Sequence, residues 1–395
     1  VVEELTENKH ARQILQQLAD EHHLITTREV DGEVVFQYHP LVRDFLLNQA
    51  RELLSAEDQQ QLQRRGAVLM ERVGQVEDTV TLLTETEDWE DLVRVIGDQA
   101  QSLVDQGRAE TLERWLEDLP DEALERAPWM LYWLSVCRLP TAPRESRRLC
   151  EKAFESFRKE PERDVRGIYL AAAGVLEAIL HDQDDLTLAD RWIEEIQRLR
   201  KEYPDYPDEA VEARVTCNLF MVIGLRQPFH PDIEEWGERI ARLSRRQVEP
   251  GVRFRVDQIA VVGLTWTGQF AQAAELIDGM RRLAQSPQVS PLSLATLRYV
   301  ESQYYMLTGD REHCLQAAYD GLEISGKHGI TVWDNSMRIH ALAGALAEAD
   351  FESADKLTAE LKESAGTMTR FDLFLFTYFQ AWQSMLGRDV VDAFH

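Results

Sequence analysis

At 395 residues the chain is too long for a single hydrophobic core, which favours either several domains or one extended repeat array. Its 70 acidic residues outnumber 43 Lys and Arg, so the formal charge is −27 at pH 7. A field of this sign repels phosphate backbones and anionic lipid headgroups. Composition therefore argues against nucleic acid and membrane surfaces as direct partners of this chain.

The four cysteines are scattered without CxxC spacing, which argues against a disulfide framework and a zinc ribbon and is typical of the reducing cytoplasm. We expect them to be small core residues: Cys137, Cys150, Cys217 and Cys314. No signal peptide opens the sequence, and no apolar run reaches the roughly 18 residues of a membrane helix. Because the sequence begins at Val1, in the middle of a predicted helix, we expect it to be a piece of a larger protein.

Residues 1–54 predict a helix, a hairpin and a second helix. The segment ARQILQQLADEHHL places three apolar residues on one helical stripe: Ile14, Leu15 and Leu18. Two extended runs then flank Asp31-Gly32, a dipeptide typical of a type I′ hairpin turn. Pro40 suits the first turn of the next helix, whose apolar face comprises Leu41, Phe45 and Leu46. This order is typical of the C-terminal part of a winged-helix domain.

The charge of this segment bears on whether its wing contacts DNA. Residues 1–54 contain ten acids and only five Lys and Arg. A wing that grips phosphates would have the reverse balance. We therefore expect the wing to pack against other domains, with DNA contact as the alternative.

From residue 55 to residue 395 the pattern is helical and repetitive. The segments TWTGQFAQAAELI and YMLTGDREHCLQAA share one pattern, an aromatic helix end, a glycine at the turn and a small alanine in the next helix. Gly309 lies 41 residues after Gly268. Ala349 follows 40 residues later, and further turns are predicted near Asp184, Gln227 and Gly387. Helix pairs recurring at this interval cannot bury their apolar stripes alone, so neighbours must stack into a superhelix. We predict an all-α fold, a tetratricopeptide-like superhelix over 55–395, with an unrelated helical bundle as the alternative.

Two stretches carry a family resemblance. FQYHPLVRDFLL resembles the YHxLxxxFL motif that closes the winged-helix segment of MalT-like regulators, which belong to the STAND group of signal-transducing ATPases. Residues Gly107 to Pro120 are similar to the G-R-x-x-T-L-x-R-W-L-x-x-L-P run of the family's first superhelical repeats, and a Pro128-Trp129 helix start follows. The specific resemblance spans about residues 24 to 140, and beyond that only the repeat pattern continues.

The resemblance implies a domain order of ATPase module, winged helix, superhelical sensor and, in many members, a DNA-binding domain of LuxR type. The sequence has no GxxxxGK[ST] motif, and Ser325-Gly326-Lys327 lacks the upstream glycine and strand that the motif requires. No cofactor is therefore expected here, and ATP would bind the missing N-terminal domain. The implied partners are the protein's own ATPase domain and either a small-molecule inducer or a protein or peptide. A passive protein-interaction scaffold is the alternative function.

No enzymatic motif is evident. The adjacent pairs Glu194-Glu195 and Glu234-Glu235 diverge on helices, which indicates a solvated face rather than a catalytic carboxylate pair. His22-His23 ends a helix, where cations offset the helix dipole. The run from His181 to Asp185 could bind a divalent ion, but it falls on a predicted turn between helices. HExxH, CxxC and GxSxG are all missing, so we expect neither a catalytic nor a metal site and no enzyme activity.

A ligand would bind the concave face of the superhelix, which the first helix of each repeat lines. Of nine tryptophans, those beside repeat turns, Trp89, Trp192 and Trp236, are explained by core packing rather than by ligand stacking. Aligning the repeats on their turns directs five side chains towards the groove: Arg214, Arg255, Gln258, Tyr299 and Gln303. They could bind a small polar molecule or an extended peptide, and the alternative is ordinary helix surface.

Overall fold

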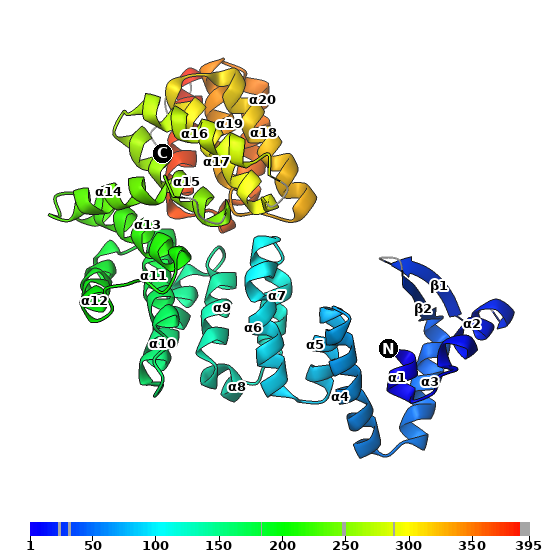
Figure 1. Ribbon diagram of the computed structural model, residues 1–395. Coiled ribbons are helices and arrows are strands. Elements are labelled where there is room, and N and C mark those ends of the chain that lie inside the picture. Colours follow the sequence, from blue (N-terminus) through cyan, green and yellow to red (C-terminus); the bar gives the residue numbers. More distant parts are fainter. Residues whose placement is uncertain (23–24, 31–32, 183, 247–249, 287–288, 388–395) are drawn as a thin grey trace. The chain divides into compact units, whose positions relative to one another are not determined.

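The computed structural model describes the chain apart from residues 23–24, 31–32, 183, 247–249, 287–288 and 388–395. Within this part helices dominate, and two strands form the one sheet (Figure 1). Contacts divide the chain into two compact units, residues 1–98 with 117–123, and residues 99–116 with 124–395. The all-α fold with one small hairpin is confirmed, and none of the described helices combines the length and apolar character that a membrane crossing requires.

The first unit begins with the predicted helix, hairpin and helix. These are α1 (Val2–Thr6), α2 (Ala11–His22), β1 (Ile25–Val30), β2 (Glu33–Tyr38) and α3 (Pro40–Leu53). The strands pair antiparallel with Ile25 opposite Tyr38, while the Asp31-Gly32 turn lies outside the described residues. His39 caps α3 by accepting a hydrogen bond from the backbone of Leu41, and Pro40 occupies the first turn. Two helices follow, α4 (Ala56–Arg72) and α5 (Val76–Glu85), and the division between the units falls within the next helix, α6 (Trp89–Asp105).

The apolar stripes of α2 and α3 form as predicted but are largely exposed. Phe45 is 61% exposed, and Leu41, Leu46 and Ile14 are exposed as well. A helix buries its stripe only where another element covers it, and α3 meets α4 at its last turn, where Gln59 Nε2 donates to the carbonyl of Leu54. The predicted boundary between residues 54 and 55 stays a prediction, since the division into compact units falls after residue 98. His22 ends α2, and His23 lies outside the described residues.

The second unit is built from successive helix pairs. It continues through α7 (Ala109–Glu117), α8 (Asp121–Arg126), α9 (Pro128–Arg138) and α10 (Pro143–Lys159). Five pairs follow: α11 (Val165–Asp182) with α12 (Ala189–Glu202), α13 (Glu209–Arg226) with α14 (Ile233–Leu243), α15 (Pro250–Trp266) with α16 (Phe270–Leu283), α17 (Pro291–Thr308) with α18 (Arg311–His328), and α19 (Asp334–Ala347) with α20 (Phe351–Glu363). Two short 3₁₀ helices, η1 (Leu186–Leu188) and η2 (Ala365–Thr367), precede α12 and the last helix, α21 (Arg370–Leu386).

The turns fall where the repeat spacing predicts them. Gly268 and Gly309 both adopt the left-handed conformation at φ 77°, and Ala349 does so at φ 58°. Gln227 is the C-cap of α13, and α11 ends at Asp182, two residues before Asp184. The further repeat expected near Gly387 lies beyond the end of α21, outside the described residues.

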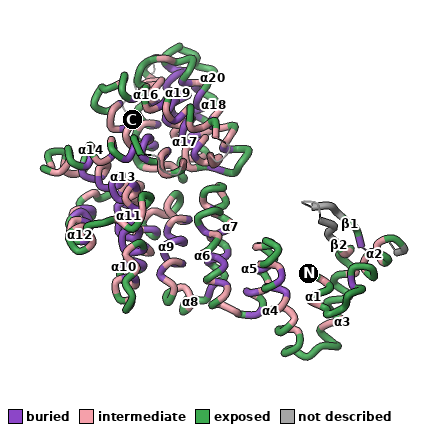
Figure 2. The backbone as a smooth tube through the Cα atoms, in the orientation of Figure 1, coloured by how far each residue is buried: buried purple, intermediate pink, exposed green. Residues whose placement is uncertain are grey.

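Packing distinguishes an inner layer of first helices from the second helices. Each first helix contacts the next one along the series α11, α13, α15, α17, α19 and α21, whereas each second helix packs on the first helices beside it. Burial follows this arrangement, and α11 is buried over most of its length (Figure 2). All four cysteines are buried and free, as expected for core residues. Trp192 and Trp236 are core residues as well, while Trp89 is half-buried.

Within the second unit, segments about 200 residues apart meet at two points. At the α6–α7 turn, a Cβ on Gly107 would lie 2.8 Å from Cγ1 of Ile330, which follows α18. At the α11–α12 turn, Asp184 pairs with Arg370 at the start of α21 and with Arg144 of α10. In both places a residue from a later repeat contacts the turn of an earlier one, Ile330 from the loop after α18 and Arg370 from the first position of α21.

These contacts predict different costs for two chemically identical substitutions. Gly107 and Gly268 share a φ of 77°, but a Cβ on Gly268 would meet nothing within 4 Å. Gly268→Ala should therefore cost only the backbone strain, about 1 kcal/mol. Gly107→Ala should cost about 1–3 kcal/mol more, because Ile330 must move. Urea unfolding of the two variants measures this difference, and equal costs would show that Ile330 does not press on the turn.

Candidate functional site

An ion cluster joins four consecutive inner helices of the second unit. Arg214 of α13 donates from Nε and Nη2 to Oε2 of Glu177 on α11, at 3.0 and 2.6 Å. Its third nitrogen, Nη1, donates to the hydroxyl of Tyr132 on α9. Arg255 of α15 donates from Nη1 to the other oxygen of Glu177 at 3.3 Å. Two of the predicted groove residues are therefore held around one carboxylate.

The charges in this cluster are strongly coupled. Burial alone would raise the pKa of Glu177, but the charges of Arg214, Arg255 and His181 together lower it to about 2. Burial opposes the charge on Arg214 too, yet the pKa of this guanidinium is raised because Glu177 and Tyr132 stabilise the cation. The side chains of Glu177 and Arg214 are 14% and 15% exposed, whereas that of Arg255 is 44% exposed. Arg255 is thus the member of the cluster that can reach a ligand.

A second acid approaches the cluster from the last helix. Asp372 of α21 is buried and accepts hydrogen bonds from Ser336 Oγ at 2.7 Å and Thr369 Oγ1 at 2.8 Å. Burial lowers the pKa of His181, one helical turn after Glu177, although the charges of Glu177 and Asp372 oppose this shift. His181 is therefore neutral at pH 7, and the acids of two inner helices both act on it electrostatically.

Tyr299 belongs to an aromatic stack between α17 and α19. Its ring lies parallel to Trp333 with the centroids 4.2 Å apart, and it also stacks on His340 at 5.7 Å. Trp333 Nε1 donates to Thr296 Oγ1 at 2.9 Å, which fixes the outer ring. Burial raises the pKa of Tyr299, and the charge of Asp372 adds to this effect. One face of Tyr299 is therefore occupied by Trp333.

His340 makes the stability of this stack dependent on pH. The residue is buried, Ser302 Oγ lies 2.8 Å from its Nδ1, and burial lowers its pKa to about 3. Between the unfolded pKa of about 6.5 and the folded pKa, only the unfolded chain binds this proton. The free energy of unfolding that His340 supports is therefore fully present above pH 6.5 and decreases as the pH is lowered below that value.

From pH 7 to pH 5 we expect His340 to remove about 2 kcal/mol of stability. His340→Gln should abolish this part of the pH dependence while retaining a hydrogen-bonding side chain. The exposed His328 provides the matched control, His328→Gln. Urea unfolding of the wild-type chain, His340→Gln and His328→Gln at pH 7 and pH 5 measures this loss of stability. An unchanged pH dependence in His340→Gln would contradict the prediction.

The remaining predicted groove residues differ in their surroundings. Gln303 is buried beside this stack, and its Oε1 has no hydrogen-bond partner among the described atoms. Gln258 is half-buried on α15, one helical turn from Arg255. The five residues thus fall into two groups, Arg214, Arg255 and Gln258 on α13 and α15, and Tyr299 and Gln303 on α17.

Sequence reasoning did not place in the groove the residues that lie near these groups: Tyr132, Glu177, Asp372 and His181, which was considered only as part of a possible metal-binding run. A signal was present for two of them. Glu177 and His181 are four residues apart in the run YLAAAGVLEAILHD, where they interrupt an otherwise apolar helix. An isolated acid in such a helix requires a partner. Asp372 carried no comparable signal, because its neighbours in space lie on distant repeats.

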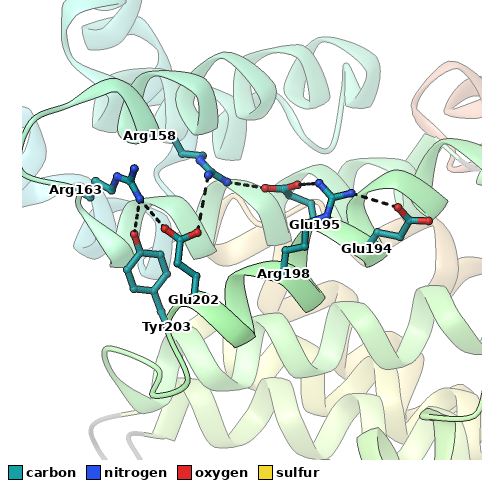
Figure 3. A network of polar contacts seen from close by, with 7 residues as sticks. All are labelled: Arg158, Arg163, Glu194, Glu195, Arg198, Glu202 and Tyr203. Carbon is teal, nitrogen blue, oxygen red and sulfur yellow. Dashed lines mark hydrogen bonds and ion pairs between the residues drawn. The ribbon is translucent and has the colours of Figure 1, made fainter.

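The adjacent glutamates lie elsewhere, on α12, in an ion-pair network with α10 (Figure 3). Glu195 accepts from Arg158 at 2.7 Å and from Arg198 at 2.8 Å, and Glu194 also accepts from Arg198. The side chain of Glu195 is only 15% exposed, so the predicted solvated face is wrong for Glu195, whereas Glu194, Glu234 and Glu235 are exposed. Both carboxylates are engaged by arginines, an arrangement that links the two helices.

The aspartates of the His181–Asp185 run also have partners. Asp182 and Asp184 pair with Arg144, and Asp185 caps η1 by accepting from Thr187. Gln183 lies outside the described residues. The described side chains of this run therefore hold α10 to the α11–α12 turn.

Comparisons with known proteins find a similarity to a known domain in the N-terminal part. The model of the MalT winged helix domain matches residues 1–63. A search of curated proteins gives no match. Among solved structures, the chain is similar to a Signal Transduction ATPase with Numerous Domains (STAND) protein with a tetratricopeptide repeat sensor from Pyrococcus horikoshii, at 13% identity and a TM-score of 0.53. The match covers 99% of this chain and 58% of that one, so the chain spans little more than half of its length.

Proposed function

We propose that this chain, which resembles MalT-like regulators, is the sensor part of such a transcription regulator. An inducer or a partner protein binds the inner layer of first helices and alters its packing. The change is then relayed to an ATPase domain and an output domain outside this sequence. Such a relay requires the ligand to bind two states with different affinity, typically by about 1–3 kcal/mol.

One observation carries the proposal. Arg255 is a largely exposed guanidinium that a single hydrogen bond ties to Glu177, beside the buried pair of Glu177 and Arg214. A ligand that replaces this bond would perturb a cluster spanning α9, α11, α13 and α15. We infer that the chain itself is not an enzyme, and that ATP binds the ATPase domain of the parent protein.

A thermal-shift screen with sugars, amino acids and nucleotides tests the sensor. A ligand present at 100 times its Kd stabilises the folded state by about 2.7 kcal/mol and raises the melting temperature. Arg255→Ala should raise the Kd of the identified ligand about tenfold or more, because a charge-assisted hydrogen bond contributes about 1.5–3 kcal/mol. The matched control is Arg198→Ala, which removes an exposed, paired arginine from a second helix.

Equal affinity of the ligand for Arg255→Ala and Arg198→Ala would reject the inner-layer site.

A passive scaffold is the second candidate, supported by the repeat architecture itself. It predicts that the chain retains one protein partner at stoichiometric yield and that no compound shifts its melting temperature.

A further inference from the structure

Between residues 100 and 350, exposed apolar side chains gather at the turns between first and second helices, whereas a separate exposed set lies along α21. Of the described residues between 100 and 350, six large apolar side chains are exposed, and five of them lie beside such a turn: Leu188, Leu225, Phe229, Trp266 and Leu307. The sixth is Tyr319, within α18. Scattered single residues would need no explanation, but this concentration marks an interaction surface.

The exposed residues also share the period of the fold. Trp266 lies 41 residues after Leu225, and Leu307 lies 41 residues after Trp266. They occupy the last two positions of α13, α15 and α17, and their side chains are 38%, 49% and 44% exposed in chain order. We call these three residues the turn-edge row. Phe229, which is 98% exposed, follows Leu225 on the same turn.

The same edge is already an interface within the chain. At two earlier turns it is contacted by a later segment, by Ile330 of the loop after α18 at Gly107 and by Arg370, the first residue of α21, at Asp184. These segments thus offer an aliphatic side chain in one place and a cation in the other. The turn-edge row continues this edge in the repeats that such a segment does not cover.

Charge favours a cationic partner. Asp185, Asp232 and Asp310 each directly precede a second helix or its η1 turn. Hydrogen bonds from Thr187 and from His313 lower the pKa of Asp185 and of Asp310, so both remain ionised. The nearby guanidiniums are already paired, Arg226 with Asp190 and Arg311 with Glu348.

A second copy of this chain fits the edge poorly. Two of the loops that follow second helices, residues 160–164, EPERD, and residues 203–208, YPDYPD, are acidic. Like charges facing each other oppose association, and the chain as a whole carries −27. The partner is therefore a different protein segment.

The spacing suggests the shape of that segment. Adjacent packed helices lie about 8–10 Å apart, and α13, α15 and α17 are consecutive neighbours. Seven residues of an α-helix span about 10.5 Å. We propose that the turn-edge row binds an amphipathic, cationic α-helix of a partner protein, with apolar residues at positions i, i+7 and i+14 and Lys or Arg beside them.

Two synthetic helical peptides of about 18 residues test the proposal on the 395-residue chain. One carries leucines at i, i+7 and i+14 among lysines and alanines, and the other has the same composition with the leucines scrambled. Binding is measured by fluorescence anisotropy at about 0.15 M salt, where nonspecific attraction is screened. The patterned peptide should bind about tenfold or more tightly than the scrambled one, because only it buries all three apolar contacts.

Substitution of the row supplies the control. Leu225→Ser, Trp266→Ser and Leu307→Ser combined should abolish the preference, while Tyr319→Ser keeps it. If the triple variant fails to fold by circular dichroism, Trp266→Ser alone should lower the preference severalfold. Equal binding of the two peptides, or a preference that survives the substitutions, overturns the proposal. Sedimentation that shows self-association of the chain, lost in the triple variant, would assign the edge to a second copy instead and also overturn it.

Discussion

Glu177→Ala should destabilise the second unit by about 3–5 kcal/mol. The substitution leaves Arg214 buried without its carboxylate, and the remaining hydroxyl of Tyr132 cannot neutralise a guanidinium. Urea unfolding followed by circular dichroism measures the loss. The matched control is Glu194→Ala, which removes a 68% exposed carboxylate and should change stability by less than about 0.5 kcal/mol.

Two further measurements separate charge burial from lost packing. Replacing both partners, Glu177→Leu with Arg214→Met, should recover at least half of the loss, because no uncompensated charge remains. The folded-state pKa of Glu177 is lowered to about 2, so its contribution is present above the unfolded value of about 4.3 and is lost as pH falls towards 2. The difference between the wild-type chain and Glu177→Ala should shrink over that range. A double variant as unstable as Glu177→Ala would show that shape, not charge, sets the cost.

Trp236→Ala should cost about 3–5 kcal/mol, the range for large aromatic side chains removed from a core. Trp236 of α14 is fully buried, and the guanidiniums of Arg200 and Arg239 lie 4.6 and 5.9 Å from the centre of its ring. Truncation therefore removes packing and two cation–π contacts at once. The natural control is Trp266→Ala, since Trp266 is half-exposed and should lose less than about 1 kcal/mol. Similar costs at both positions would contradict the assignment of Trp236 to the core.

The repeat turns and the hairpin could be predicted because their determinants are local. Gly268 and Gly309 are needed where the chain turns with positive φ, and Pro40 starts a helix whatever surrounds it. Turn glycines and helix-starting prolines of this kind can be recognised in a single sequence. The 41-residue spacing then implied the stacking of helix pairs, since one pair cannot bury its own stripe.

The interior cluster could be predicted only in part, because its partners come from distant repeats. Arg214 and Arg255 lie on α13 and α15, but the sequence does not reveal that both bind Glu177, 37 and 78 residues away. Asp372 affects His181 and Tyr299 only because α21 lies near the earlier inner helices. The angle between successive repeats determines that proximity, and many small packing contacts fix the angle together.

The buried thiols have a practical consequence for observing this molecule at work. Burial raises the pKa of Cys150 to about 11 and of Cys217 and Cys314 to about 12. Alkylating reagents should therefore not react with these three thiols in the native chain. Each thiol becomes reactive only when its own helix opens, and the three lie on α10, α13 and α18. Mass spectrometry of timed labelling would therefore resolve which segment an inducer loosens or tightens, without any introduced tag.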